Sequence, residues 1–230
     1  MLATQYNLLH ETYYGHGNFD LDNTLLGGDS DHAWGEFLVS EGIVDSHEFQ
    51  QQNDEFYRQY QQGGLDIQAY LSFAIAPLSR FSSAELSKLH QSFMSKYITP
   101  LRLPKADALI KQHREAGDFL MIITATNSFV TAPIAAALGI DTLLASEAEI
   151  IDGRYTGKPS GMPCFQDGKV QRLKEWLAAN KQSLDGSYFY SDSHNDLPLL
   201  KVVDKPCAVD PDEKLRQYAE TAGWPVISLR

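Results

Sequence analysis

The spacing of hydrophobic residues changes near the middle of the chain. From about residue 31 to about residue 100, apolar side chains recur every three or four positions, which is the spacing of one face of an α-helix. Four helices are predicted there, with apolar faces formed by Ala33, Phe37 and Leu38; Phe56, Tyr57 and Tyr60; Ile67, Tyr70, Leu71 and Ile75; and Leu86, Leu89, Phe93 and Tyr97. The stretch Ser82-Ser83-Ala84-Glu85 has the pattern of a capping box, so the fourth helix should begin there.

After about residue 104, short apolar runs alternate with helical patterns. These runs predict two helices, at 128–138 and 169–179, and four strands, at 119–123, 143–145, 188–190 and 226–228. A hairpin is predicted at 149–155, because Asp152-Gly153 suits a type I′ turn. Alternating strands and helices predict an α/β fold with a parallel sheet covered on both faces. The helical segment is then an insertion after the first strand.

The first strand departs from this pattern. A central parallel strand should be almost continuously hydrophobic, yet Phe19 is the one apolar residue in the sequence Gly15-His16-Gly17-Asn18-Phe19. We therefore expect the first eighteen residues to be atypical of the fold.

The composition is that of an ordinary globular protein, with 43% hydrophobic and 21% charged residues among 230. No run approaches the roughly 20 apolar residues of a membrane helix, and no secretory signal is visible, so a cytoplasmic location without membrane contact is expected. Cys164 and Cys207 should then be reduced core residues. The net charge of −11, with no cluster of lysine and arginine, argues against nucleic acid as a partner.

Two groups of polar residues follow predicted strands and suit phosphate chemistry. Asp20 and Asp22 leave the first strand together, so one could attack phosphorus while the other handles protons and lends its backbone to a metal. Thr124 follows the strand at 119–123, where a hydroxyl and free N–H groups make an anion site. The alternative for this second group is a helix N-cap, formed by Thr126, Asn127 or Ser128.

Two further groups lie later in the chain. Lys169 is at the start of a helix, where the helix dipole makes a positive charge slightly unfavourable, so its presence there suggests a functional role. Lys158 is the other candidate for that role. Asp192 and Asp196 follow the strand at 188–190, and their oxygens suit a hard cation such as Mg²⁺, whereas His194 is expected to be exposed and incidental. Ligands of open α/β sheets bind beyond the carboxyl ends of the strands, so the four groups should converge there.

This combination resembles the haloacid dehalogenase-like (HAD) hydrolase superfamily, in subfamily IB, the branch that contains the phosphoserine phosphatases. The matching residues are Asp20, Asp22 and Thr24; Thr124; Lys169; and Ser191-Asp192 with Asp196. The longer strings around them are similar to a bacterial subgroup that is phosphoserine phosphatase-like or histidinol-phosphatase-like. The resemblance covers residues from about 19 to 210. It implies a Rossmann-like core domain at 1–27 and 105–230, and a helical cap domain at 28–104.

The resemblance also implies a phosphatase mechanism. Asp20 would be the nucleophile that forms an aspartyl-phosphate, and Asp22 would be the general acid and base. Mg²⁺ would be held by Asp20, the backbone carbonyl of Asp22 and Asp192, with Asp196 completing or orienting the shell. The residues expected to bind phosphoryl oxygens are Thr124, Lys169 and Asn195.

The partner implied is a small-molecule phosphate ester. Asp29 stands where the phosphoserine phosphatases have a glutamate near the substrate amine, which suggests an aminated substrate, but a helix cap would explain it equally well. Arg58 and Arg80 could bind a substrate carboxylate or lie on the surface. A second set could form a pocket wall or belong to the core: His32, Trp34, Tyr57 and Phe73. Between phosphoserine and histidinol phosphate, the subgroup resemblance favours histidinol phosphate.

Two other functions stay open at this stage. The same aspartyl-phosphate could pass to an alcohol, which would make the protein a phosphotransferase. Alternatively, the fold could serve as a non-catalytic binding module, although clustered carboxylates are costly without a cation. Magnesium-dependent release of phosphate from p-nitrophenyl phosphate separates an enzyme from a binding module. The sequence indicates no oligomeric state.

Overall fold

The structure, a computed structural model, describes residues 15–230 and contains one seven-stranded sheet. Its strand order is β4-β3-β2-β1-β5-β6-β7, and every neighbouring pair is parallel except β3 and β4. The strands are β1 (His16–Phe19), β2 (Phe119–Asn127), β3 (Thr142–Ile151), β4 (Arg154–Ser160), β5 (Tyr188–Ser191), β6 (Lys205–Val209) and β7 (Val226–Ile227). The α/β fold predicted from the sequence is confirmed.

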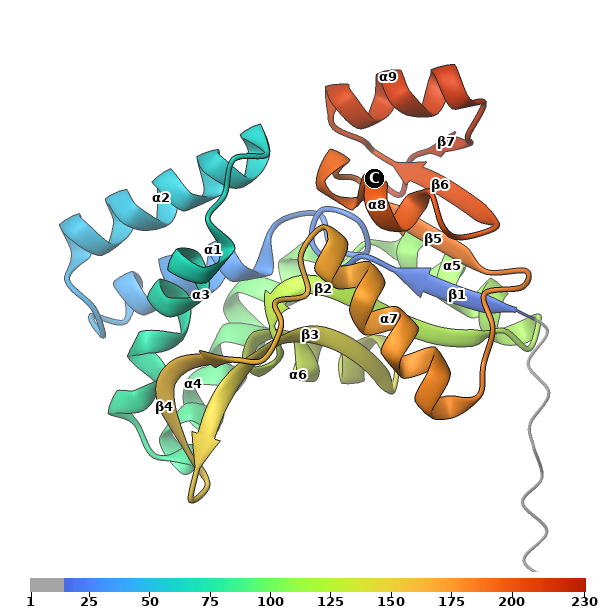
Figure 1. The fold of residues 1–230 in the computed structure, drawn as a ribbon. Coiled ribbons are helices and arrows are strands. Elements are labelled where there is room, and N and C mark those ends of the chain that lie inside the picture. Colours follow the sequence, from blue (N-terminus) through green and yellow to red (C-terminus); the bar gives the residue numbers. More distant parts are fainter. Residues whose placement is uncertain (1–14) are drawn as a thin grey trace, which may run out of the picture.

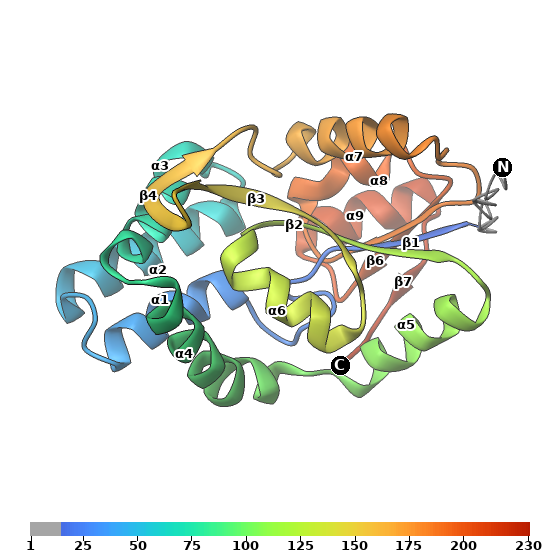
Figure 2. The same ribbon diagram turned by 90° about the horizontal axis from the view of Figure 1, so that it is seen from below.

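Helices cover both faces of the sheet, as Figure 2 shows. They are α5 (Pro104–Glu115) and α6 (Ser128–Leu138) on one face, and α7 (Asp167–Asn180), α8 (Leu197–Leu200) and α9 (Glu213–Ala222) on the other. Successive residues of β2 point to opposite faces, so Ile122 packs with the α5–α6 side while Met121 and Ile123 pack with the α7–α9 side. The sheet therefore separates two hydrophobic cores.

The segment between β1 and α5 is helical, and its helices lie together at one end of the molecule (Figure 1). Its main helices are α1 (Ser30–Ser40), α2 (Ser46–Gln62), α3 (Ile67–Ile75) and α4 (Ser83–Phe93). We call residues 30–101 the helical insertion. The capping box at Ser82 and Glu85 is confirmed at the start of α4. Where the chain enters and leaves the insertion, Leu26 forms a bridge with Arg102 and the Gly27 N–H donates to the Leu101 carbonyl at 2.8 Å.

The hairpin of β3 and β4 extends from the sheet to the helical insertion (Figure 1). Asp152 and Gly153 both have positive φ, 50° and 74°, as the predicted type I′ turn requires. The Ser83 hydroxyl of α4 donates to the Gly153 carbonyl at 2.9 Å. A Cβ on Gly157 would lie 3.1 Å from the Ala76 carbonyl oxygen, so β4 closely approaches the turn after α3. The hairpin thus forms a second connection between sheet and insertion.

The expectation that a central strand must be hydrophobic was wrong for β1. All four of its residues are buried between β2 and β5. A Cβ on Gly17 would lie 3.0 Å from the His113 ring, so glycine makes room for that side chain. The Asn18 amide donates to the Tyr188 carbonyl at 2.9 Å, and the Phe19 ring stacks on Tyr190. Neighbouring aromatic rings therefore fill the space that aliphatic residues of β1 would otherwise occupy. The rest of the atypical segment, residues 1–14, lies outside the described part of the chain.

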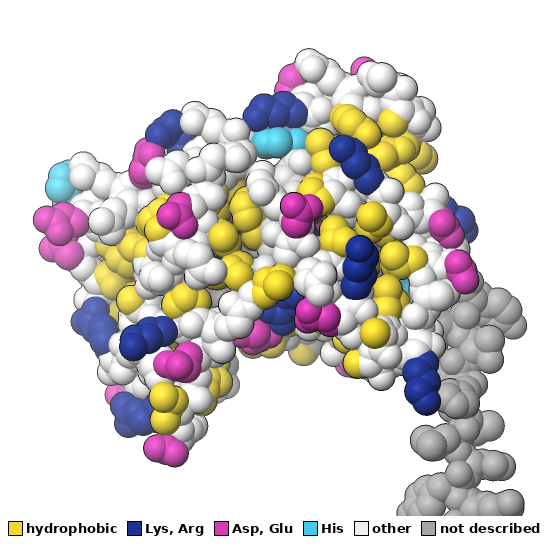
Figure 3. All heavy atoms as spheres, in the orientation of Figure 1, with side chains coloured by type: hydrophobic (Ala, Val, Ile, Leu, Met, Phe, Trp, Pro, Cys, Tyr) yellow, Lys and Arg dark blue, Asp and Glu magenta, His cyan; other side chains and the backbone are white. Residues whose placement is uncertain are grey.

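Three other features bear on the expectations from composition. Cys164 and Cys207 are both buried and free. Among residues 15–230, no helix combines the length and the apolar character that crossing a bilayer requires. On the face seen in Figure 3, acidic and basic side chains are interspersed.

Candidate active site

The predicted chemical groups converge at the carboxyl ends of β1, β2 and β5. Asp20 directly follows β1, Thr124 lies near the end of β2, and Asp192 directly follows β5. These three strands are adjacent in the sheet, so their ends meet at one edge. The register of β2 against β3 shifts between Ile123 and Asn127, which places Thr124 in an irregular part of the strand. One edge of the sheet therefore carries the site.

Asp20 and Lys169 form a buried ion pair at the centre of this edge. The Lys169 Nζ lies 2.9 Å from Asp20 Oδ1 and 2.8 Å from Asp196, and these side chains are at most 4% exposed. Burial raises the pKa of Asp20 to about 7, although the charge of Lys169 lowers it. Burial also lowers the pKa of Lys169, but the two carboxylates outweigh this and raise it. Lys169 thus has a structural reason to stand at the start of α7, whereas Lys158 is exposed on β4.

Asp22 turns its carboxylate toward the helical insertion. Its Oδ1 accepts the Ser30 N–H at 2.7 Å, and its Oδ2 accepts the Thr126 hydroxyl at 2.8 Å. Burial, followed by the charge of Asp29, raises its pKa to about 7. A carboxyl group with such a pKa can hold and release a proton near neutral pH.

Asp192 and Asp196 differ in what their side chains contact. Asp192 Oδ1 accepts the Thr24 hydroxyl at 3.0 Å, and burial together with the charge of Asp20 raises its pKa well above the usual value. Asp196 Oδ2 accepts from both Lys169 and the Ser191 hydroxyl, at 2.8 and 2.7 Å. Within residues 15–230, no three acidic, histidine or cysteine side chains gather closely enough to hold a metal by themselves.

The donor set nevertheless fits a hard cation. Asp20 and Asp192 offer buried carboxylate oxygens, and burial is the largest cause of the raised pKa of each; the charge of Asp20 raises the pKa of Asp192 further. Mg²⁺ is commonly held by one or two carboxylates with water completing the shell, so two such side chains suffice. The contacts of Asp196 suit a role in orienting Lys169 better than direct binding of the cation. Both carboxylate oxygens of Asp22 accept hydrogen bonds, so its backbone carbonyl is the atom that could bind the cation.

Asn195 and His194 connect this edge to neighbouring elements. The Asn195 amide donates to the Tyr60 carbonyl of α2 at 3.0 Å and accepts from Gln166 at 3.2 Å, so its predicted contact with phosphate stays a prediction. The expectation of an exposed His194 was wrong. Its ring is half-buried, bonds to Asp212 at 2.7 Å and lies so close to Gly63 that a Cβ there would be 2.6 Å away. This histidine packs where the insertion meets the sheet.

Of the candidates for the helix cap, Asn127 starts α6, since its side-chain oxygen accepts the Val130 N–H at 3.3 Å. Thr124 is 1% exposed, and its hydroxyl oxygen accepts the Thr126 N–H at 3.2 Å. It lines the same cavity as Asp20. Of the polar residues predicted at the end of this strand, Asn127 therefore caps the helix and Thr124 faces the site.

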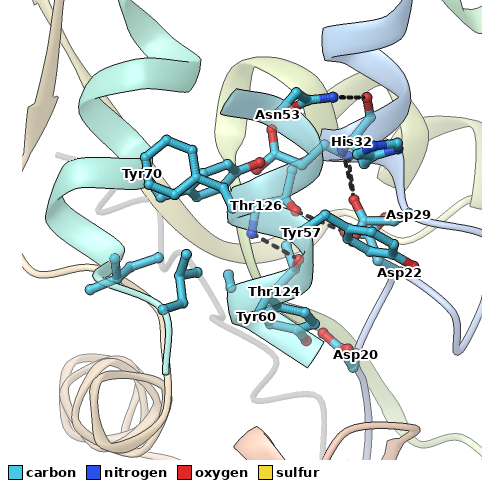
Figure 4. Close-up of a pocket in the computed structure, with 15 residues that line it drawn as sticks. Asp20, Asp22, Asp29, His32, Asn53, Tyr57, Tyr60, Tyr70, Thr124 and Thr126 are labelled. Atoms are coloured by element: carbon cyan, nitrogen blue, oxygen red, sulfur yellow. Dashed lines mark hydrogen bonds between the residues drawn. The ribbon is translucent and has the colours of Figure 1, made fainter. Parts of the chain in front are cut away.

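A cavity lies over Asp20, between the sheet edge and the helical insertion (Figure 4). The insertion contributes Asp31, His32, Tyr57 and Tyr70 to its wall, and Asp29 lies just before the insertion. None of the described residues that line it is a lysine or an arginine. Of the other candidates for a pocket wall, Trp34 packs in the core against Phe37 and Phe93, and Phe73 packs against Phe49. Arg58 and Arg80 are exposed, and Arg58 is paired with Glu55.

Asp29 is the N-cap of α1, as the alternative interpretation of its position supposed. Its Oδ1 accepts the N–H groups of Asp31 and His32 at 3.0 and 2.8 Å. Asp31 was missed from the sequence, although an acid in the first turn of a helix that follows the Asp20–Asp22 loop was a signal available to find it. Its carboxylate is 5% exposed and lines the cavity.

Comparisons with known proteins find relatives over most of this chain. The sequence model of the haloacid dehalogenase-like hydrolases matches residues 18–201. The chain is 46% identical over 216 residues to a histidinol-phosphatase of Neisseria meningitidis, covering 92% of this chain and 97% of that protein. It is 30% identical over 215 residues to a phosphoserine phosphatase of Mycobacterium tuberculosis, covering 92% and 70%.

Solved structures show the same fold. A protein of Bordetella pertussis described as having unknown function superposes with a TM-score of 0.89 at 43% identity, covering 95% of this chain and all of that one. A phospho-aspartyl intermediate analogue of phosphoserine phosphatase superposes with a TM-score of 0.67 at 18% identity, covering 95% of both chains. The sequence match over most of the chain and the shared fold place this protein in the haloacid dehalogenase-like hydrolase family, among its phosphatases.

Proposed function

We propose that this protein hydrolyses small phosphate monoesters through an aspartyl-phosphate on Asp20, with Mg²⁺ as cofactor. We further propose that its substrates are amino-alcohol phosphates without a carboxylate, the class to which histidinol phosphate belongs. The observation that carries the substrate class is the cavity over Asp20, which is lined by four aspartates and, among the described residues, by no lysine or arginine.

In the first half-reaction, a carboxylate oxygen of Asp20 forms a bond to phosphorus as the bond from phosphorus to the ester oxygen breaks. Asp22 gives its proton to the departing oxygen, which its pKa of about 7 allows. In the second half-reaction, Asp22 takes a proton from water, whose oxygen displaces Asp20 from phosphorus. Lys169 and Thr124 hold phosphoryl oxygens, and bound Mg²⁺ supplies further positive charge for the approach of carboxylate and phosphate.

The charge of the cavity distinguishes the two candidate substrates. Phosphoserine carries a carboxylate that would face Asp29 and Asp31 with no cationic side chain to receive it. Histidinol phosphate has an amine and an imidazole but no carboxylate. The candidate carboxylate receptors, Arg58 and Arg80, lie exposed on the surface. The name of the Neisseria relative at 46% identity supports the same choice.

The test is phosphate release from histidinol phosphate, phosphoserine and p-nitrophenyl phosphate, each with Mg²⁺ and with excess chelator. We expect histidinol phosphate to have the highest kcat/KM and chelation to stop all three reactions. Release from none of them would favour a binding module. Transfer of phosphate to an added alcohol in preference to water would favour a phosphotransferase.

A further inference from the structure

Tyr60, in the last turn of α2, brings a phenol ring from the helical insertion to the carboxylates of the sheet edge. It lines the cavity over Asp20, and Figure 4 shows its ring close to that side chain. Its other charged neighbours are Asp192 and Asp196, and its hydrogen-bond neighbour is the Ser193 side chain. The phenol of Tyr60 therefore lies among the groups that we propose to hold the phosphoryl group and its cation.

The end of α2 is fixed to the core by hydrogen bonds to its last carbonyl groups. The final carbonyls of a helix lack their usual partners within the helix. Here the Asn195 amide donates to the Tyr60 carbonyl and the Lys214 Nζ donates to the Gln62 carbonyl, both at 3.0 Å. Asn195 directly precedes Asp196 in the chain, so one of these contacts comes from the site itself. The position of Tyr60 relative to Asp20 is thus held by the core.

The cavity over Asp20 is small, and Tyr60 forms part of its boundary with a second cavity. Its volume is about 40 Å³, whereas cavities that hold ligands usually measure about 300–1,000 Å³. The second cavity has a volume of about 390 Å³ and is lined by Asp192 and Ser193, and Tyr57 and Tyr60 line both cavities. A phosphoryl group on Asp20 would have little free space around it, so its oxygens would lie close to the side chains of the wall.

A phenol hydroxyl suits the surroundings of a phosphoryl group. It is neutral near pH 7 and can donate a hydrogen bond. Phosphoryl transfer spreads negative charge over three oxygens, and donors directed at these oxygens stabilise it. Of the two side chains already proposed as donors, Lys169 also bonds to two carboxylates and Thr124 has a single hydroxyl. A further donor would therefore strengthen the site.

We propose that Tyr60 is a further catalytic residue, whose hydroxyl donates a hydrogen bond to an oxygen of the phosphoryl group on Asp20. Asn195 is then its positioning residue, because the Asn195 amide is bonded to the Tyr60 carbonyl. This inference rests on the proposed function. It adds a group from the helical insertion to a phosphoryl site whose other residues, Asp20, Thr124 and Lys169, lie outside the insertion.

The experiment measures the binding of inorganic phosphate, in the presence of Mg²⁺, by isothermal titration. Tyr60→Phe removes the hydroxyl alone and should weaken the affinity about ten- to 150-fold, the loss of one hydrogen bond to a charged group. The matched control is Tyr57→Phe, which removes the same atom from the preceding turn of α2, where that hydroxyl bonds with Asn23 and Gln61. Its affinity should fall less. An equal or larger fall for Tyr57→Phe would overturn the assignment.

Turnover distinguishes the phosphoryl group from the rest of a substrate. Histidinol phosphate, phosphoserine and p-nitrophenyl phosphate share the phosphoryl group and differ beyond the ester oxygen. Tyr60→Phe should therefore lower kcat/KM by similar factors for each of these esters that the wild type hydrolyses. A fall for one ester alone would place Tyr60 at the departing part of the substrate and contradict the proposal.

A double-mutant cycle tests the role of Asn195. If its amide acts through Tyr60, Asn195→Ala should weaken phosphate binding in the wild type and weaken it less when Tyr60→Phe is already present. A loss of the same size in both backgrounds would show that Asn195 contacts phosphate itself, and would refute its role in positioning Tyr60.

The titration keeps this inference separate from the proposed function. Phosphate binding that depends on Tyr60, in a protein that releases no phosphate from any ester, would refute the proposed function and keep Tyr60 in the phosphate site. Hydrolysis and phosphate binding that do not change in Tyr60→Phe would do the opposite. A lower Tm of Tyr60→Phe, together with a fall of the same size in its affinity for Mg²⁺ alone, would show that Tyr60 supports the structure and would overturn the phosphoryl contact.

Discussion

Replacing Lys169 by methionine tests whether the ion pair beneath the site is as buried as the structure shows. Methionine keeps much of the length and apolar surface of the side chain but removes its charge. Asp20 and Asp196 would then be left buried, 3% and 1% exposed, without their shared cation. Removing one partner from a buried pair typically costs about 3–5 kcal/mol of stability.

Urea unfolding in excess chelator measures this loss. With a slope of about 2 kcal/mol per molar urea, the expected shift of the midpoint is roughly 2 M toward lower urea. The matched control is Lys158→Met, because Lys158 is exposed on β4 and its loss should change stability by no more than about 0.5 kcal/mol.

The pH dependence follows from the sign of the pKa shift of Asp20. Its folded-state pKa is raised to about 7 from 3.8, so protonation favours the folded state and stability is lost as pH rises through about 7. Lys169 lowers that pKa, so its removal raises it further. The cost of Lys169→Met should accordingly be larger at pH 8 than at pH 5. Equal stability of the Lys169 and Lys158 variants at both pH values would refute the buried pair.

Three more tests have distinct expected outcomes. Asp20→Asn should abolish turnover with the fold intact, whereas Asp22→Asn should lose about 10²–10⁴-fold in kcat; wild-type rates in either variant, measured free of contaminating phosphatase, would remove that residue from the mechanism. Added Mg²⁺ should raise the Tm more at pH 8 than at pH 5, because a cation favours ionised Asp20; a calorimetric scan that showed the reverse would contradict the metal site. Asp29→Ala should cost about 1 kcal/mol in urea unfolding while Asp29→Asn costs little, and equal stability of the two would contradict the cap.

The sequence located the chemistry better than it located the surroundings. Asp20 and Asp192 directly follow their strands and Thr124 lies near the end of its own, and because parallel strands end at one edge, local order in the sequence was enough to bring them together. The strand β6 was not predicted, since it begins with Lys205-Pro206, residues that are uncommon in strands. Polar β1 was misjudged because its partners, among them His113 and Tyr188, come from distant parts of the chain.

The lining of the cavity was still harder to predict, because it depends on contacts between residues that are distant in the sequence. Tyr70 was expected only on the apolar face of its helix, and Tyr57 either there or in a pocket wall, and both line the cavity over Asp20. Helical periodicity tells which residues share a face but not whether that face meets a core or a cavity. Asp31 escaped notice for a related reason, since its place in the cavity wall becomes visible only when α1 is placed against Asn127.

The β3–β4 hairpin limits how the helical insertion can swing. The two chain crossings, at Leu26 and Arg102, pair with each other and would alone act as a hinge about a single axis. Ser83 and Gly153 join the insertion to the hairpin at a point away from that axis. Any rotation that opens the cavity must break this tether or bend the hairpin along with it. Because β3 pairs with β2, bending the hairpin would also strain the strand that carries Thr124, so opening of the cavity would be coupled to the position of that residue.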